Sequence, residues 1–363
     1  MITLVRVLDL GTSAIICTIL LATLLLHGCD RASSDPRPVV VYVSADEAIA
    51  RPILQQFEAA TGIEVLPVFD TEVTKTTGLV TRLRSERERP RADLFWSSEC
   101  FRMIELDQDG MLAPLTGAPF DDWMSGRAGL WRSDAGTWHA FAPRARVLVH
   151  RVEEAGERET PLPGTWFELA DPRWKGRIAM ADPRFGTTSG HLGAMKAYWI
   201  RDGRPERFDD WVDGLAGNEV AILTTGNAGV VEAVAAGRYD IGMTDTDDVW
   251  AARERGFDVA LIYPRHASAD RVGGGTLLIP NTVARIVGGP NPEGAHALAR
   301  WLLSEEVEDL LARSSSHNIR LRSDGTDPYD VPDVLDVDLV EASAQMPEAI
   351  RRLRGAVRTG GEE

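Results

Sequence analysis

Cysteine is scarce in this chain, with only Cys17, Cys29 and Cys100 among 363 residues. Cys17 lies inside an apolar N-terminal run and Cys29 stands at its end, which leaves Cys100 alone in the rest of the sequence. A disulfide within that remaining part and a cysteine-based metal site are therefore excluded. We expect Cys100 to be a small buried apolar residue.

Positively charged residues are also scarce relative to acidic ones. The sequence has 39 Lys and Arg against 55 Asp and Glu, which gives a net charge of −16 at pH 7. Nucleic acids and other polyanions need clustered basic side chains, so the composition argues against them as partners. The sequence also has no Gly-x-Ser-x-Gly, His-Glu-x-x-His, P-loop or Gly-x-Gly-x-x-Gly motif. We predict that the protein is not an enzyme, with a metal-dependent hydrolase as the alternative.

A single long apolar run occurs, over residues 10–26, and Arg6 precedes it. A basic start, a short apolar stretch and small residues at its end are typical of a secretory signal peptide, here residues 1–28, rather than of a spanning helix. The run ends in LHGC, which resembles a bacterial lipobox that closes at Cys29. We expect an exported protein that a lipid on Cys29 anchors at the periplasmic side of the cell membrane, with residues 29–38 as a tether.

Strands and helices alternate from there on. VVVYVS, residues 39–44, is a continuous apolar run suited to a buried parallel strand. Ile49, Ile53 and Phe57 then recur at four-residue spacing on one face of a helix, and a second strand follows over residues 63–69. Strand, helix and strand together make a βαβ unit.

The same alternation continues and predicts an α/β fold with mostly parallel sheets. Further strands are expected at residues 93–96, 145–150, 176–181, 219–224, 240–244, 258–264 and 275–280. Further helices are expected at residues 74–86, 100–110, 228–236, 248–255, 292–303 and 305–313.

The polar loops after these strands are the candidate binding loops, because ligands of open α/β sheets bind beyond the carboxyl ends of the strands. The most informative loop is residues 244–248, where Asp245, Asp247 and Asp248 place three carboxylates within four residues. Such carboxylates repel one another and favour a cation, a shared proton or open solvent. Capping of the following helix is the alternative interpretation. An EF-hand is excluded, since Gly256 stands where its twelfth-position Glu is required.

Other loops offer groups that hold anions. Residues 186–190, GTTSG, open a helix with small residues whose N–H groups can form an anion cradle, and simple capping by Thr or Ser explains them equally well. Arg144 and Arg146 share one face of a strand and can clamp an anion or a carboxylate with paired N–H donors. A solvated strand face is the alternative for these two arginines.

Several segments, in this order and spacing, carry a family resemblance: VVVYVSADE, ADLFWSSE, RARVLVH, LADPRWKGRIAMADPRFGTTSG, GNAGVVEAVAAGRYDIGMTD and the stretch from TLLIPNTVARI to LLSEEVEDLLA. The chain resembles bacterial extracellular solute-binding proteins of family 1 type, in the periplasmic ferric-iron-binding group, which are receptors of ABC importers. The resemblance implies a two-lobed periplasmic binding protein of type II. Each lobe would be a mostly parallel sheet flanked by helices, with hinge strands between the lobes and the ligand in a cleft that closes.

The resemblance also implies roles for the loops, with one departure. Ferric-binding members carry two adjacent tyrosines where this sequence has Asp247 and Asp248, and its five tyrosines form no adjacent pair. Carboxylate oxygens still suit a hard cation. For Asp46, Glu47 and Glu99, the alternative interpretation is that they are ordinary acidic residues at helix N-termini. Ser98, rather than Glu99, is the alternative equivalent of a ligand carboxylate of the family. The predicted ligand-binding residues are Ser44, Asp46, Glu47, Ser98, Glu99, Arg144, Arg146, Thr187, Thr188, Ser189, Asn227, Asp245, Asp247 and Asp248, and the predicted metal ligands are Glu47, Glu99, Asp247 and Asp248.

We therefore expect a monomeric receptor that passes a small solute to the permease and ATPase of an ABC transporter in the inner membrane. The expected cargo is iron(III) or another cation, such as a divalent metal, with an anion, and no resident cofactor is predicted. A small organic solute, such as an aminophosphonate or a sugar phosphate, is the alternative cargo, and a sensor kinase is the alternative partner. The predicted boundaries are residues 39–147 for the first part of lobe 1, 148–265 for lobe 2, 266–350 for the return to lobe 1 with C-terminal helices, and 351–363 for a flexible tail.

Overall fold

The computed structural model describes residues 37–70, 76–123, 131–152, 160–267, 273–322 and 327–359. The predicted signal peptide and Cys29 lie outside these residues. Within the described ranges, no helix combines the length and the apolar character that crossing a membrane requires.

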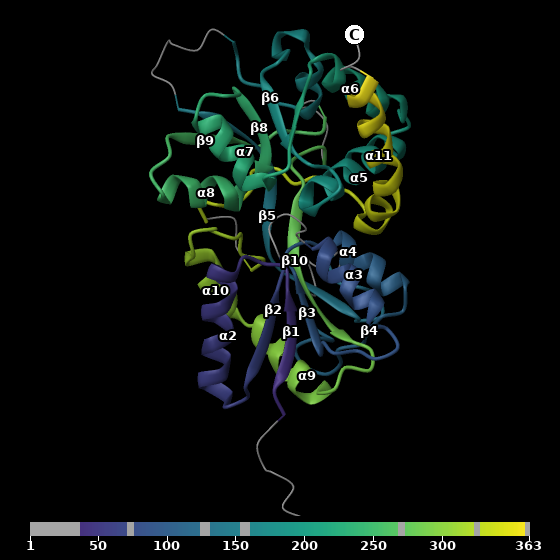
Figure 1. Ribbon diagram of the computed structural model, residues 1–363, viewed down its shortest axis with the longest axis vertical. Helices are drawn as coiled ribbons and strands as arrows, with labels where there is room; N and C mark the ends of the chain where they lie inside the picture. The colour runs from purple at the N-terminus through teal and green to yellow at the C-terminus, as the bar shows by residue number, and fades with distance from the viewer. Residues whose placement is uncertain are drawn as a thin grey trace, which may run out of the picture. The chain divides into compact units, whose positions relative to one another are not determined.

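The predicted α/β fold is confirmed (Figure 1). A ten-stranded sheet runs through the described chain in the order β2-β1-β3-β10-β5-β8-β6-β7, with β4 beside β10 and β9 beside β5. The strands are β1 (Val39–Val43), β2 (Val65–Phe69), β3 (Leu94–Ser97), β4 (Leu112–Ala113), β5 (Trp138–Arg151), β6 (Ile178–Ala181), β7 (Ala221–Leu223), β8 (Ile241–Asp245), β9 (Val259–Ile262) and β10 (Leu278–Ile286).

Helices connect the strands and cover the sheet. They are α2 (Glu47–Thr61), α3 (Thr77–Ser85), α4 (Phe101–Gln108), α5 (Gly186–Arg201), α6 (Glu206–Gly217), α7 (Gly226–Ala235), α8 (Thr246–Glu254), α9 (Pro292–Leu302), α10 (Glu305–Arg313) and α11 (Leu339–Thr359). Two short 3₁₀ helices, Trp166–Ala170 and Pro172–Trp174, precede β6.

Strand β5 joins the two halves of the sheet. Its beginning pairs antiparallel with β10, up to Ala145 opposite Leu278, and its end pairs antiparallel with β8 and β9. Within the halves, β1 pairs parallel with β2 and β3, and β6 pairs parallel with β7 and β8, whereas β10 pairs antiparallel with β3 and β4. We call β1 to β4 with β10 the first half, and β6 to β9 the second half. Figure 1 shows β5 and β10 running between the halves, as the expected hinge strands would.

The start of β5 was not predicted, because the alternation before residue 145 is interrupted. Pro143 cannot donate a ladder hydrogen bond, and Ala142 has a φ of 40°. The pairing register with β10 shifts at the same level, between Ile279 and Asn281. This irregularity leaves only residues 145–150 with a clear strand pattern.

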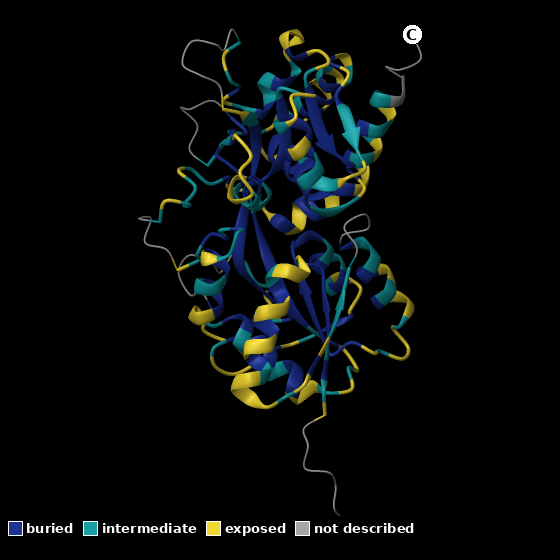
Figure 2. Cartoon of the chain, turned by 60° about the vertical axis from the view of Figure 1, so that its left-hand side comes forward, coloured by how far each residue is buried: buried dark blue, intermediate teal, exposed yellow. Residues whose placement is uncertain are grey.

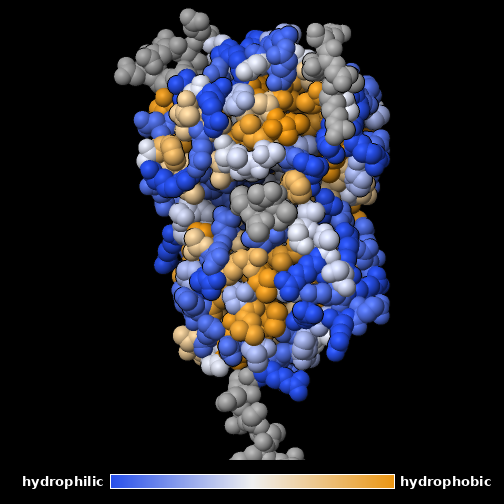
Figure 3. Space-filling model, in the orientation of Figure 1, coloured by the Kyte–Doolittle hydropathy of each residue, from blue (hydrophilic) through white to orange (hydrophobic). Residues whose placement is uncertain are grey.

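Apolar side chains fill both faces of the first half, as its continuous apolar strand predicted. Val39, Val41 and Val43 pack toward α2 and α9, whereas Tyr42 faces the core under α3 and α4. Full burial of one such side chain contributes roughly 1.5–3 kcal/mol. Figure 2 shows the strands buried and the outer faces of the helices exposed, and hydrophilic residues form most of the face drawn in Figure 3.

The predicted helix ranges do not include α6 or α11, and of α5 only the start, over residues 186–190, was predicted. Helix α11 packs against α5, α6 and α4, and a Cβ on Gly193 would lie 2.2 Å from the carbonyl oxygen of Ala342, so the glycine permits the close approach. The helix runs to Thr359, into the predicted tail over 351–363, because Leu353 is fully buried. Cys100 is buried, as predicted.

Candidate functional site

A pocket of about 50 Å³ lies where the carboxyl ends of β3, β6, β7 and β8 meet the middle of β5. This is the position at which open α/β sheets bind ligands. The pocket draws residues from both halves of the sheet. Its lining consists of Ser98, Arg144, Ala181, Asp182, Phe185, Gly186, Thr187, Thr188, Leu223, Thr224, Gly226, Asn227, Asp245, Asp247 and Asp248.

Three helices begin at this pocket, namely α5, α7 and α8. In the described structure none of the three has a side chain hydrogen-bonded as its N-terminal cap. The first N–H groups of a helix lack partners within the helix, and its dipole favours negative charge there. The pocket is therefore surrounded by backbone donors suited to an anion.

Glycine makes two of these helix starts possible. Gly186 and Gly226 have φ angles of 54° and 71°, a left-handed conformation that side chains other than glycine's disfavour. The residue after each glycine is right-handed helical. This change from a left-handed to a right-handed backbone conformation makes successive N–H groups point into one small concavity. A Cβ added at Gly186 would meet no described atom within 4 Å, so backbone conformation rather than crowding selects glycine there.

A buried polar network forms one wall of the pocket. The fully buried Arg146 guanidinium donates from Nη1 to Asp245 Oδ1 at 3.0 Å and to Asn227 Oδ1 at 3.2 Å, and from Nη2 to Thr188 Oγ1 at 3.1 Å. The other oxygen of Asp245 accepts from Asn227 Nδ2 at 2.8 Å and from the hydroxyl of Thr187. Arg146 therefore holds the starts of α5 and α7 against the end of β8.

Both oxygens of Asp245 are used within this network, and its carboxylate is 1% exposed. A buried ion pair of this kind is sensitive to loss of one partner, because the other charge stays buried without compensation. We assign Arg146 and Asp245 to the construction of the pocket rather than to its free binding surface.

Arg144 lies two residues earlier on β5 and enters the pocket itself. Its Nη2 donates to the carbonyl oxygen of Ser98 at 2.7 Å, and its Nε lies 3.2 Å from Asp247 Oδ2. Burial disfavours the charged guanidinium, but Asp247 and the neighbouring Asp245 and Asp248 outweigh burial and raise the pKa of Arg144. This side chain links the end of β3 to the start of α8.

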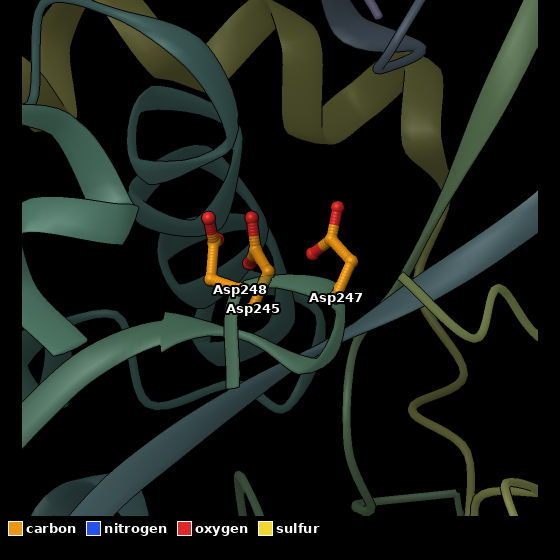
Figure 4. A group of neighbouring side chains, drawn as sticks. All are labelled: Asp245, Asp247 and Asp248. Atoms are coloured by element: carbon orange, nitrogen blue, oxygen red, sulfur yellow. The ribbon is translucent and has the colours of Figure 1, made fainter. Parts of the chain in front are cut away.

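Asp245, Asp247 and Asp248 form a carboxylate group in the structure. One oxygen of each lies within 4.8 Å of the others, and Figure 4 shows the three side chains rising on the same side of the loop. Asp245 is buried, whereas Asp247 and Asp248 are partly exposed and line the pocket. Although all three line the pocket, the structure therefore separates one buried carboxylate, at the end of β8, from two partly exposed carboxylates in the first turn of α8.

The structure does not bring Glu47 and Glu99 to this group. Glu47 is exposed on α2 and pairs with Arg51 at 2.6 Å. Glu99 is fully buried, and its carboxylate accepts from the backbone N–H groups of Phe101 at 2.6 Å and Arg102 at 3.2 Å, which makes it the cap of α4. Burial raises the pKa of Glu99 to about 7. Both acids follow strands in the sequence, but each side chain turns to its own helix.

The remaining predicted residues take supporting positions. Ser44 accepts from the backbone N–H of Ser98 at 2.8 Å and so orients that residue at the pocket. Ser189 donates to the carbonyl oxygen of Gly186 at 2.6 Å, within its own helix turn. Asp46 is exposed and lines a smaller hollow that also contains Ser98, Arg144 and Asp247.

Asp182 lines the pocket although the sequence interpretation passed over it. It follows β6 directly, so the strand-end rule could have found it. Burial alone would raise its pKa, but Arg184, which donates from Nε to Asp182 Oδ1 at 2.9 Å, lowers it. Because the charges of Asp182 and Arg184 cancel, this ion pair adds no net charge to the pocket.

A comparison with protein families matches residues 39–314 to bacterial extracellular solute-binding proteins. The chain belongs to this family. Among curated relatives, Iron uptake protein A1 of Synechocystis sp. is 24% identical over 85% of this chain and 84% of that protein. The Fe(3+)-binding periplasmic protein of Serratia marcescens is 24% identical over 86% of each chain.

Solved structures with the same fold include iron-bound HitA from Pseudomonas aeruginosa, with a TM-score of 0.71, 21% identity, and coverage of 88% of this chain and 99% of that one. AfuA from Actinobacillus pleuropneumoniae, with exogenous fructose-6-phosphate bound, has a TM-score of 0.72, 18% identity and coverage of 88% and 98%. The predicted two-lobed fold is thereby confirmed. The relatives are binding proteins, and this solute-binding protein is not an enzyme.

Proposed function

We propose that this solute-binding protein is the receptor of an ABC importer and captures a small solute in the pocket between the two halves of the sheet. The observation that carries the proposal is the meeting of opposite charges around one small cavity: the carboxylates of Asp247 and Asp248, and the uncapped starts of α5 and α7. A solute that contacts both groups suits a site with both signs of charge.

Binding in this pocket is expected to favour a closed state. Ser98 follows β3 and Arg144 lies on β5, whereas the other lining residues lie at or after the ends of β6, β7 and β8 or in the first turns of α5, α7 and α8. A solute that touches both sets gains contacts only when the halves are close, so its differential affinity shifts the population toward closure. The same closed receptor would be recognised by the permease or, in the alternative, by a sensor kinase.

In this proposal the solute is a cation accompanied by an anion. Iron is the cation named for several relatives, and hard carboxylate oxygens suit Fe³⁺ or a divalent metal. Among the described lining residues there is no Tyr, His or Cys, so Asp247 and Asp248 would be the protein's metal ligands. The fructose-6-phosphate in AfuA and the presence of Arg144 favour a small organic solute as the second candidate.

Metal analysis of the full chain, purified without chelator, tests this function. We expect near-stoichiometric iron or divalent metal per chain, and its loss from the Asp247→Asn, Asp248→Asn double variant. Glu254→Gln is the matched control, because Glu254 lies at the other end of α8 and pairs with His317 at 2.8 Å. Equal metal content in the double variant would contradict the assignment of the site.

Lipidation of Cys29 belongs to the same proposal, since LHGC resembles a lipobox. A lipid would hold the receptor at the periplasmic side of the membrane beside its transporter. Replacement Cys29→Ser should move the protein from the membrane fraction to the soluble fraction after export. Retention of the variant in the membrane fraction would contradict the anchor.

A further inference from the structure

We infer that the surface around Arg87, Arg89 and Arg91, at the end of the first half away from the solute pocket, binds the headgroups of anionic phospholipids. We call residues 87–91, together with the hollow that they line, the arginine edge. The inference rests on the proposed lipid anchor, which brings the chain to a membrane. It adds a second contact, which fixes the end of the protein that meets the lipid.

Positive charge is concentrated at this edge of an otherwise acidic chain. Residues 87–91 contain three arginines and one glutamate, Glu88, and so carry a net charge of +2 in a protein of net charge −16. Arg87, Arg89 and Arg91 are exposed, and none of them has an ion pair or a side-chain hydrogen bond to another described residue. Their guanidinium groups can therefore bind phosphate oxygens through paired N–H donors.

A hollow of about 190 Å³ lies beside these arginines and has the mixed lining that suits a lipid headgroup. Arg87 and Arg91 line it together with the apolar side chains of Leu83, Met111, Ile286 and Val287. Val287 is 47% exposed, so an apolar surface accompanies the charge. The hollow exceeds the roughly 10–15 Å³ that a water molecule needs and is smaller than the roughly 300–1,000 Å³ of drug-sized pockets, which suits a headgroup rather than a whole lipid.

The acids near the hollow do not cancel its positive charge. Glu86 and Glu88 also line the hollow, but Glu86 accepts from Arg82 Nε at 2.9 Å. Arg84 donates from Nε to Asp109 at 2.9 Å, so this acid is neutralised as well. Glu88 alone then opposes the three exposed arginines, and the arginine edge attracts anionic lipid.

The point where the tether joins the fold lies beside the arginine edge. Pro38 directly precedes β1, and at the start of β1 the N–H of Val40 donates to Asp93 Oδ2 at 2.8 Å. Asp93 follows Arg91 by two residues. From Cys29 to Pro38 the chain advances by 38 − 29 = 9 residues, which span at most about 30 Å when fully extended. A lipid on Cys29 would therefore keep this edge close to the membrane.

Docking at the arginine edge turns the solute pocket away from the lipid. Strands β1 and β3 run parallel, and β3 ends at the pocket, so the amino ends of both strands lie at the opposite edge. In Figure 1 the amino end of β1 lies at the far end of the first half from α8, which begins at the pocket. The same lipids repel the acidic remainder of the protein, so charge selects this edge. A receptor held in this way keeps its pocket open to solutes.

Hydrogen exchange of the full chain on vesicles of two compositions tests the inference. The protein is purified from the membrane fraction and reconstituted on phosphatidylcholine or on equimolar phosphatidylcholine and phosphatidylglycerol. We expect the backbone amides of residues 86–92 to exchange more slowly on the anionic vesicles. Salt at about 1 M, where the Debye length is about 3 Å, should remove the difference.

Variants of the arginines locate the contact. Arg87→Gln with Arg91→Gln should lower the docked-to-undocked ratio roughly 30-fold, because each arginine near an anionic surface contributes about 1 kcal/mol. Arg238→Gln with Arg255→Gln is the matched control, since these exposed arginines follow α7 and α8 in the second half and the change in charge is the same. The control should keep the slow exchange. Both double variants should bind as much metal as the wild type and unfold at the same urea concentration.

The outcomes separate this inference from the lipid anchor. If the protein binds both kinds of vesicle and residues 86–92 exchange equally on them, the inference is wrong and the anchor stands. If the protein binds only the anionic vesicles and the Arg87→Gln, Arg91→Gln variant loses that binding, the anchor is wrong and the inference stands. If the control variant loses the slow exchange as fully, net charge rather than the arginine edge attracts the lipid, and the inference is wrong.

Discussion

Two pairs of charges occupy neighbouring positions in this pocket and differ in their surroundings. Arg146 and Asp245 are at most 1% exposed, and each has further hydrogen bonds to Asn227 or to the threonines of α5. Arg144 and Asp247 are 8% and 17% exposed at the side chain and line the cavity. A step of two residues along β5, and of two residues from the end of β8 into α8, therefore separates charges that build the pocket from charges that face its contents.

The largest effect should come from breaking the buried pair. Arg146→Met would leave the Asp245 carboxylate buried without its guanidinium, and we expect the free energy of unfolding in urea to fall by about 3–5 kcal/mol. Arg51→Met is the matched control, because Arg51 pairs with Glu47 on the surface, where such pairs contribute about 0–1 kcal/mol. Equal losses in the two variants would contradict the distinction between buried and exposed pairs.

The pH dependence of stability should identify Glu99 as a buried cap rather than a ligand. Burial raises the pKa of its carboxyl to about 7 in the folded protein, from an ordinary value near 4.5. The folded state therefore holds the proton more tightly, and this contribution to stability is present below about pH 4.5 and is lost as the pH rises to about 7, by roughly 3 kcal/mol. Relative to Glu99→Gln, the wild type should lose stability over this range in urea unfolding; parallel curves would refute the buried carboxyl.

Removal of one pocket-facing carboxylate should affect binding and spare the fold. For Asp248→Asn we expect the metal bound per chain to fall, because one of the two carboxylate ligands of the proposed cation is lost. The free energy of unfolding should change by about 0.5 kcal/mol or less, since Asp248 is partly exposed. Metal analysis and urea unfolding on the same preparation measure both quantities, and a large loss of stability would place Asp248 with the buried pair.

A smaller effect is expected at the start of α7. Gly226→Ala forces a side chain into a left-handed conformation at φ 71° and should lower the free energy of unfolding by about 1–2 kcal/mol. Gly217→Ala at the end of α6 is the control, because this exposed glycine has no such φ and alanine there should stabilise by up to about 1 kcal/mol. Unfolding curves that move in the same direction for both variants would contradict the role of the Gly226 backbone.

Much of the pocket could be predicted from the sequence by one rule, that ligands lie beyond the carboxyl ends of strands. Ser98, Thr187, Asn227, Asp247 and Asp248 were selected in this way, and all of them line the cavity. The rule works because parallel strands carry their following loops to one edge of the sheet. The rule requires only the positions of the strands in the sequence, and runs of hydrophobic residues indicate these positions.

The pairing of charges could not be predicted, because it depends on contacts between distant parts of the chain. Arg146 meets Asp245 through the antiparallel register of β5 and β8, 99 residues apart in sequence. Glu99 and Glu47 follow strands as Asp247 does, yet their side chains turn to α4 and α2. Similarly, the end of α11 is fixed by burial of Leu353 rather than by a local stop signal.

The most direct test compares Asp245→Asn with Asp248→Asn, measuring the free energy of unfolding and the metal bound per chain in each. The two substitutions are chemically identical and lie three residues apart. The account predicts a loss of about 3 kcal/mol in stability for Asp245→Asn and a loss of bound metal without a loss of stability for Asp248→Asn. Equal effects of the two substitutions on stability would contradict the division of this loop into a carboxylate that builds the pocket and carboxylates that face the solute.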